Sequence, residues 1–116
     1  MIRSKTFTFD TFGFKVTVHM GEDVRTAVLK YKRSREECDK SELGDELAVT
    51  FIVDDPGGAF IFFNDSRPNA AIIAHEAWHV VFGMFEYYGL DVKDEEAVAY
   101  HLMWLVHKIH KMLERK

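Results

Sequence analysis

The sequence predicts an α+β fold in which a small, mostly antiparallel sheet packs on three helices, in the order ββ-α-ββ-α-α. Two pairs of β-rich runs flank turn-forming residues at 10–13 and 54–58, which predicts two hairpins. Three further segments space their apolar residues at helical intervals, one between the hairpins and two after them. This arrangement favours a sheet covered by helices, and a length of 116 residues predicts one domain spanning 1–116.

The first hairpin is predicted within residues 5–19. Apolar residues alternate there with threonine and lysine, at Phe7, Phe9, Phe14, Val16 and Val18. The segment 10–13, Asp-Thr-Phe-Gly, interrupts the alternation with turn chemistry. After the hairpin, helical spacing over about 22–37 predicts the first helix, with Val24, Ala27, Val28 and Tyr31 on its apolar side.

The second hairpin is predicted from two runs, Leu47–Val53 and Ala59–Phe63, on either side of Asp-Asp-Pro-Gly-Gly. Both runs are apolar at consecutive positions, so both faces of these strands are apolar. Such a strand is covered on both faces, or offers one of them to a ligand. We expect the last strand, 59–63, to form an edge to which an extended peptide can add.

The second predicted helix runs from about Asn69 to Tyr88 and stops at Gly89. At about 100° per residue, its apolar residues fill a broad arc. The members of that arc are Ile73, Ala74, Ala77, Trp78, Val80, Val81, Met84 and Phe85. His75, Glu76 and His79 fall on a separate strip with Ile72, Gly83 and Glu86, and Gly83 is expected to let the last helix approach closely.

The last helix is predicted to begin after a short link, with Asp91 or Asp94 as its cap. Glu95 and Glu96 favour its N-terminal end because the helix dipole is positive there. Its apolar stripe consists of Val98, Leu102, Leu105, Val106, Ile109 and Leu113.

Composition excludes several classes of function. The net charge of −4 gives no reason to expect a nucleic-acid partner. No apolar stretch reaches the roughly 18 residues of a membrane span, and the N-terminus lacks the features of a signal peptide. The single cysteine, Cys38, cannot form an internal disulfide, so a reducing, cytoplasmic location is expected.

The motif that carries chemistry is His75-Glu76-Ala77-Trp78-His79, which reads H-E-x-x-H. On a helix, the i, i+4 spacing places both imidazoles on one face, where each can give a nitrogen to one Zn²⁺. Glu76 lies about 100° round the helix from His75, close enough to act as general base on an activated water. A chance match is the alternative, and structural context decides between the two.

A catalytic zinc ion takes three protein ligands, so a third donor is expected on an element beside the motif helix. The last helix offers Glu95, Glu96 and three histidines, His101, His107 and His110. With Glu96 set at 0°, the apolar stripe centres near 230° and Glu95 lies at about 260°. The residues alone leave both glutamates open, and either is also explained as an acid that favours the helix dipole.

The motif together with Glu96-Ala97-Val98-Ala99-Tyr100 resembles the small zincin-like, gluzincin-type metallopeptidase-like proteins encoded by bacteriophages and prophages. The second element also resembles the Glu-x-x-Ala-Asn of a broader family of bacterial zinc peptidases, with Tyr100 in place of Asn. The resemblance implies a zincin-like domain with His75, His79 and Glu96 on the metal and Glu76 as base. It also implies the cytoplasm of the host cell as location.

These observations predict a zinc-dependent metallopeptidase that hydrolyses a peptide bond through a metal-activated water, with Glu76 as general base. Its expected partner is a protein or peptide substrate; no nucleic acid or membrane partner is expected, and the oligomeric state is left open. Tyr100 is either a donor to a developing oxyanion or an aromatic residue at the edge of the core. Two alternatives remain: a catalytically silent, zinc-stabilised protein-binding module, and a metal-free core in which the imidazoles are hydrogen-bonded.

Overall fold

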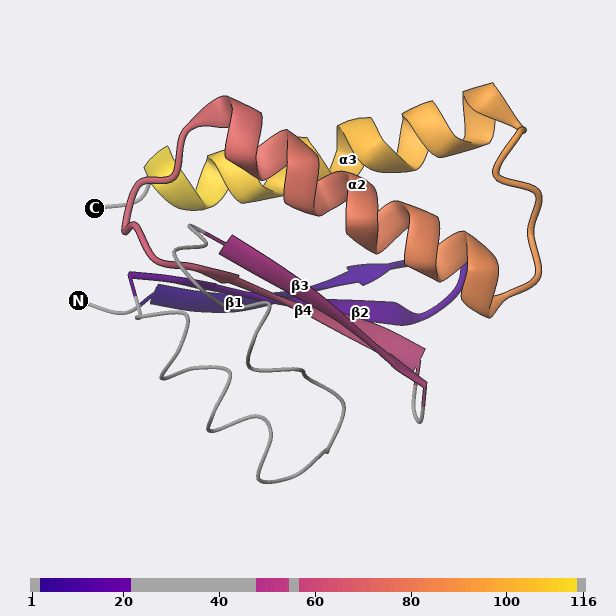
Figure 1. Cartoon of the computed structure of the whole chain (residues 1–116), viewed down its shortest axis with the longest axis horizontal. Coiled ribbons are helices and arrows are strands. Elements are labelled where there is room, and N and C mark those ends of the chain that lie inside the picture. Colours follow the sequence, from indigo (N-terminus) through magenta and orange to yellow (C-terminus); the bar gives the residue numbers. More distant parts are fainter. Residues whose placement is uncertain (1–2, 22–47, 55–56, 115–116) are drawn as a thin grey trace.

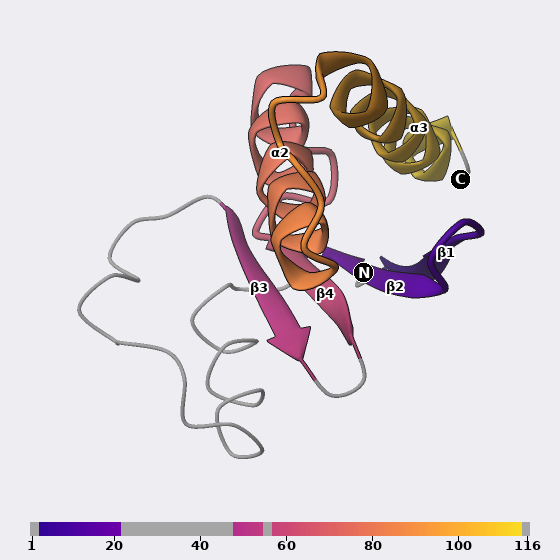
Figure 2. The same cartoon turned by 90° about the vertical axis from the view of Figure 1, so that its right-hand side faces the viewer.

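The computed structural model describes residues 3–21, 48–54 and 57–114, which form a four-stranded sheet with two helices on one face (Figures 1 and 2). The elements are β1 (Arg3–Phe9), β2 (Phe14–Met20), β3 (Ala48–Asp54), β4 (Gly57–Phe63), α2 (Ala70–Tyr87) and α3 (Glu95–Glu114). The predicted α+β class is confirmed. The helix predicted over 22–37 lies outside the described residues. The described elements follow the order ββ-ββ-α-α with two helices, not ββ-α-ββ-α-α with three.

Both hairpins form where the turn chemistry predicted them, and each is antiparallel. The strand order is β1-β2-β4-β3, and the two hairpins join through a parallel pairing of β2 with β4. The sheet is therefore mixed. The sequence did not predict this, because alternation within a hairpin carries no information about how two hairpins pair with each other.

The strand order corrects one prediction. The run 59–63 lies in β4, an interior strand paired on both sides, so it is not an edge. Its continuous apolar character fits this position, since interior strands are covered more completely than edge strands. The edge strands of the described sheet are β1 and β3.

The core lies between the sheet and the two helices. Alternate residues of β2 face the helices and are fully buried, namely Phe14, Val16, Val18 and Met20. The helices contribute Ile73, Ala77, Val80, Val81, Met84 and Phe85 from α2, and Val98, Leu105, Ile109 and Met112 from α3. Ala74 and Trp78, which the helical arc included, are exposed instead. In the part of the chain that the structure describes, neither helix has the length and apolar character to span a membrane.

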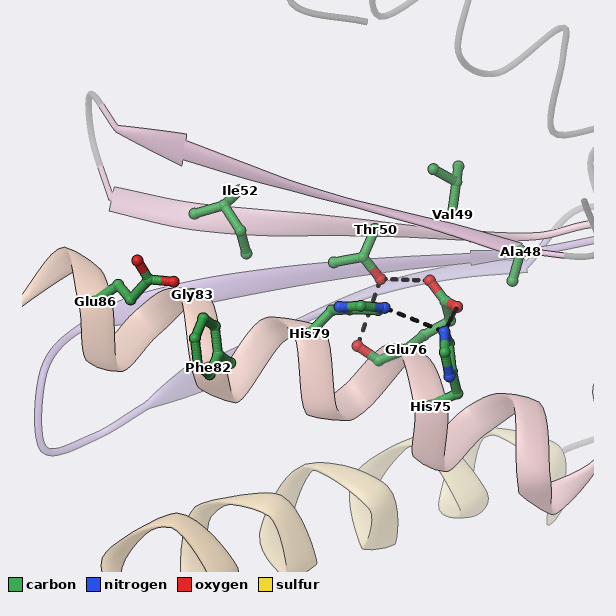
Figure 3. Close-up of a pocket in the computed structure, with 10 residues that line it drawn as sticks. All are labelled: Ala48, Val49, Thr50, Ile52, His75, Glu76, His79, Phe82, Gly83 and Glu86. Atoms are coloured by element: carbon green, nitrogen blue, oxygen red, sulfur yellow. Dashed lines mark hydrogen bonds and ion pairs between the residues drawn. The ribbon is translucent and has the colours of Figure 1, made fainter. Parts of the chain in front are cut away.

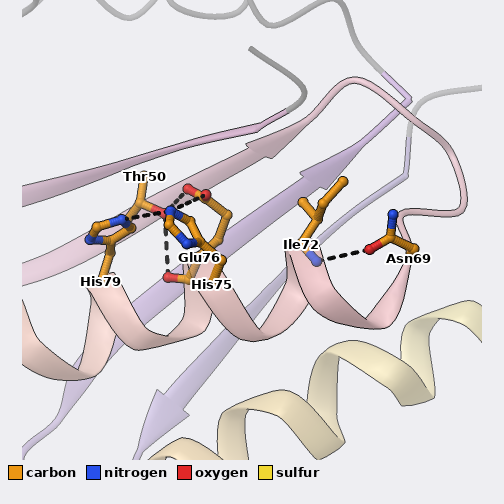
Figure 4. A network of polar contacts seen from close by, with 6 residues as sticks. All are labelled: Thr50, Asn69, Ile72, His75, Glu76 and His79. Atoms are coloured by element: carbon orange, nitrogen blue, oxygen red, sulfur yellow. Dashed lines mark hydrogen bonds and ion pairs between the residues drawn. The ribbon is translucent and has the colours of Figure 1, made fainter.

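Local capping fixes both ends of α2 and the start of α3. The Asn69 side chain accepts a hydrogen bond from the Ile72 amide at 2.9 Å (Figure 4), and Gly89, with φ of +67°, follows the helix end. The Asp94 side chain accepts from the Ala97 amide at 3.3 Å, whereas Asp91 accepts from Lys93 within the link. Of the two predicted caps, Asp94 is therefore the one that caps α3.

Candidate metal centre

The two motif histidines lie on the side of α2 that faces β3 (Figure 3). The apolar side of α2 is turned into the core, which leaves the strip containing His75 and His79 beside the edge strand. Both histidines are exposed. The helical pattern in the sequence predicted a polar strip apart from the buried side of α2, and the two histidines follow it, whereas Glu76 of the same strip is buried.

The two imidazoles converge. Nε2 of His75 lies 3.1 Å from Nε2 of His79, with ring centroids 4.7 Å apart and ring planes at 82°. Together with a carboxylate oxygen of Glu76, these nitrogens form a group whose atoms all lie within 4.8 Å of one another. The i, i+4 spacing produces this convergence directly, because one helical turn stacks the two side chains.

Glu76 is buried, with 6% of its surface exposed, and is the only buried charged side chain among the described residues. Its carboxylate needs a partner there, because a buried charge without a hydrogen bond is costly. The Thr50 hydroxyl of β3 lies 2.7 Å from Oε1 and donates to it, while Oε2 lies 3.8 Å from Nε2 of His75 (Figures 3 and 4). The carboxylate is thus held between the edge strand and the histidines.

Thr50 is a residue of the site that the sequence pattern did not single out. The alternate residues Ala48, Thr50 and Ile52 of β3 line the site together with Val49 and α2. Thr50 is the polar member of that alternating set, within a strand that is otherwise apolar up to Asp54. A polar residue at an inward position of an apolar strand is the signal that could have found it.

A cavity of about 380 Å³ lies between α2 and β3 and contains the histidines. Its lining consists of Ala48, Val49, Thr50, Ile52, His75, Glu76, His79, Phe82, Gly83 and Glu86 (Figure 3). Beside Gly83, α2 and β3 approach each other closely. A Cβ on Gly83 would lie 2.6 Å from Cδ1 and Cγ1 of Ile52. Gly83 therefore admits β3, not the last helix that we expected.

The structure does not bring the predicted third ligand to the histidines. The helices run antiparallel (Figure 1), and Phe85 of α2 packs on His101 of α3 with ring centroids 5.6 Å apart. His79 lies six residues before Phe85 and Glu96 five residues before His101, so they lie on opposite sides of this contact, about 16 Å apart along the axis. Glu95 and Glu96 are exposed and belong to no group of metal-ligating side chains in the described chain.

The other residues considered on α3 are also separate from the site. Tyr100 is 62% exposed and does not line the cavity, so its side chain is not positioned toward the histidines. His107 is exposed and His110 half-buried, and neither belongs to the metal-ligating group of the described chain. His101 is half-buried, with Nδ1 2.7 Å from the Ala97 carbonyl oxygen and its ring against Phe9, Phe12 and Phe85. It serves the core and is not a surface histidine.

The two imidazoles fit two of the three protein-ligand positions around a catalytic zinc ion. Two nitrogens bound to tetrahedral Zn²⁺ at about 2.0–2.1 Å would lie roughly 3.3 Å from each other, close to the observed Nε2 separation. Imidazole nitrogens and carboxylate oxygens are also ligands that zinc takes in proteins. Without a metal, the same separation allows one N–H···N hydrogen bond between two neutral rings.

Comparisons with protein-family models, with curated proteins and with solved structures give no match. The resemblance to phage-encoded zincin-like proteins therefore rests on residues 75–79 and 96–100 alone, and no comparison tests the assignment of Glu96 to the metal.

Proposed function

We propose that the protein is a zinc-dependent peptidase in which His75 and His79 bind the metal and Glu76 acts as general base. One observation carries the proposal: two convergent imidazole nitrogens stand beside a buried carboxylate whose position is fixed by a hydrogen bond from another element. A chance H-E-x-x-H sequence has no reason to place its glutamate in this way.

In this proposal the zinc ion activates the water, and side chains of the protein transfer the proton. When bound, Zn²⁺ lowers the pKa of water towards neutrality and polarises a carbonyl group. Glu76 takes a proton from the attacking water and passes it to the amine that leaves. Thr50 holds Oε1, which leaves Oε2 on the side of the histidines for this proton transfer.

The substrate in this proposal is an extended peptide bound along β3. β3 is an edge strand of the described sheet and forms one wall of the cavity that contains the histidines. Main-chain hydrogen bonds to an edge strand give affinity without requiring one particular sequence. This replaces the role that sequence analysis assigned to the strand 59–63.

The position of the histidines supports an enzyme over a zinc-stabilised binding module. Both are exposed at the rim of a cavity, whereas the core is built from apolar residues on the other side of α2. A structural zinc ion supplies folding energy to a small core, which this arrangement does not require. We place the activity in the cytoplasm because the single Cys38 fits a reducing compartment.

The test begins with untagged protein, since a polyhistidine tag would bind zinc itself. Elemental analysis should find about one zinc per chain, and calorimetry should show that His75→Ala and His79→Ala each lose most of the affinity. His107→Ala is the matched control, because His107 is an exposed histidine on α3 outside the site.

Catalysis is tested with a library of acetylated decapeptides and product analysis by mass spectrometry. Glu76→Gln keeps the shape of the side chain and should retain zinc while losing cleavage. Cleavage that survives in Glu76→Gln, or zinc affinity that survives in both histidine variants, would overturn the proposal.

A further inference from the structure

We propose that Glu86 selects peptides that carry a lysine or arginine side chain about three residues from the cleaved bond, on its amino-terminal side. This inference rests on the proposed function of the site and names its substrate class. It follows from the position of Glu86, from its lack of a partner among the described residues, and from the geometry of the cavity.

Glu86 lines the same cavity as the histidines, at the end beyond Phe82 and Gly83 (Figure 3). Its carboxylate points to the same side of α2 as His75 and His79 (Figure 3). The side chain is exposed, and its carboxylate has no hydrogen bond or ion pair with any described residue. Its charge is therefore available to a ligand in the cavity.

The helix makes this end of the cavity more attractive to a cation. Glu86 belongs to the last turn of α2, which contains no basic residue. The C-terminal end of a helix carries a partial negative charge, so a glutamate there is at the unfavourable end. No lysine or arginine lies three or four residues away on either side to offset it. The dipole and the carboxylate together attract a positive side chain.

The spacing sets the position of that side chain. Glu86 follows His79 by seven residues, which corresponds to about 10.5 Å along the helix. An extended peptide advances about 3.4 Å per residue, so this distance spans about three residues. Ile52 and Phe82 line the cavity between the two points, which suits an apolar side chain in the intervening stretch.

The direction of the peptide follows from β3. Thr50 contacts Glu76 and Ile52 faces Gly83, so β3 and α2 run in the same direction. Antiparallel strand pairing is the more stable arrangement. A peptide added to β3 in this way runs from Glu86 towards His75, which places the basic residue before the cleaved bond.

The first experiment measures cleavage preference. Acetylated decapeptide libraries are fixed as lysine, norleucine or glutamate at one position, and products are located by mass spectrometry. The wild type should prefer lysine over norleucine about threefold at the third position before the bond, as expected for an exposed ion pair, and less in high salt. Glu86→Gln should remove this preference, and Glu86→Lys should reverse it towards glutamate. Glu114→Gln is the matched control, because Glu114 is an exposed glutamate at the end of α3, outside the cavity.

The second experiment measures binding without cleavage. Fluorescein-labelled lysine and norleucine peptides are titrated into zinc-loaded Glu76→Gln protein, where the lysine peptide should bind about threefold more tightly. This difference in affinity between the two peptides should vanish in the double variant that carries Glu86→Gln together with Glu76→Gln.

The two experiments separate the possible failures. If the wild type cleaves peptides with a preference that Glu86→Lys leaves unchanged, this inference is overturned and the peptidase proposal stands. If no peptide is cleaved but lysine peptides bind through Glu86, the peptidase proposal fails and the cation selectivity stands. Absence of both effects overturns both.

Discussion

Thr50 is the residue on which the geometry of the site depends. It lies on a different element from the motif, and its hydroxyl holds the one buried charged side chain of the described chain, Glu76, at 2.7 Å. A hydrogen bond to a charged group contributes about 1.5–3 kcal/mol. Loss of this bond would leave the carboxylate buried with one fewer donor and free to rotate.

We therefore expect Thr50→Val, which replaces the hydroxyl by a methyl group, to lower the cleavage rate by about tenfold or more. The reason is that Glu76 would no longer be held in one orientation. The measurement is the cleavage rate on the decapeptide library, together with zinc affinity, which should change little. Thr50→Ser keeps the hydroxyl and should restore most of the rate. Equal losses in both variants would assign Thr50 a packing role instead.

Glu96 provides a second prediction for a single residue. Because α3 places it about 16 Å along the axis from His79, on the far side of the Phe85–His101 contact, we expect Glu96→Gln to leave zinc affinity unchanged. Calorimetric titration with zinc checks this, with His79→Ala as the variant that loses affinity. A loss of tenfold or more in Glu96→Gln would restore the ligand assignment that the family resemblance implied.

The sequence predicted the part of the site that lies within one turn of α2. His75, Glu76 and His79 share one helical turn, so their spacing alone places them together. Thr50 and Glu76 are 26 residues apart and meet only because β3 packs on α2. The residues alone left Glu95 and Glu96 open for the same reason: helical angles indicate which residues share a face, but not which neighbouring element that face meets.

At the scale of elements, the contact between α2 and β3 builds the cavity. Gly83 lets the strand approach until Ile52 occupies the space that a side chain would fill. This approach keeps Thr50 within reach of Glu76, which lies about two turns before Gly83 on the helix. The packing of this one pair of elements therefore determines the shape of the site.

We expect Gly83→Ala to destabilise the protein by about 1–2 kcal/mol. Alanine favours a helix by about 0.5–1 kcal/mol over glycine, but overpacking against Ile52 costs about 1–3 kcal/mol. Urea unfolding provides the measurement, and Ile52→Ala completes a double-mutant cycle. The double variant should be more stable than the sum of the single effects, whereas additive effects would contradict a clash at this point.

Element boundaries were predictable because turn and cap residues mark them. Asp10 to Gly13 closes the first hairpin, Asn69 caps α2, and Gly89 ends it with a positive φ. The order of the strands was not predictable in this way. The apolar run of β4 is explained equally well by an edge that binds a ligand and by an interior strand, and only the pairing with β2 decides between them.

At the scale of the whole molecule, the two motif histidines lie outside the hydrophobic core. Residues on the buried side of α2 pack with the sheet and α3, while the histidines face the other way. Such a protein should fold without zinc and gain stability when zinc binds, because a ligand stabilises the state to which it binds.

We expect the circular dichroism spectrum of the protein to be unchanged by a chelator. At a free zinc concentration 100 times Kd, the folded state gains about 2.7 kcal/mol, which raises Tm by about 10 °C for a chain of this size. The His75→Ala and His79→Ala variants should show no such rise. Unfolding on chelation would contradict this prediction and favour a structural zinc ion.

The parallel seam between β2 and β4 has a consequence for how the chain reaches its native state. Within each hairpin, partners are close in the sequence, and such contacts close within microseconds. Across the seam, Val16 meets Ala59, 43 positions later. Closing so large a loop slows folding, since the entropy is lost before the contacts form. The two hairpins should therefore form first, and the β2–β4 pairing that joins them should form late.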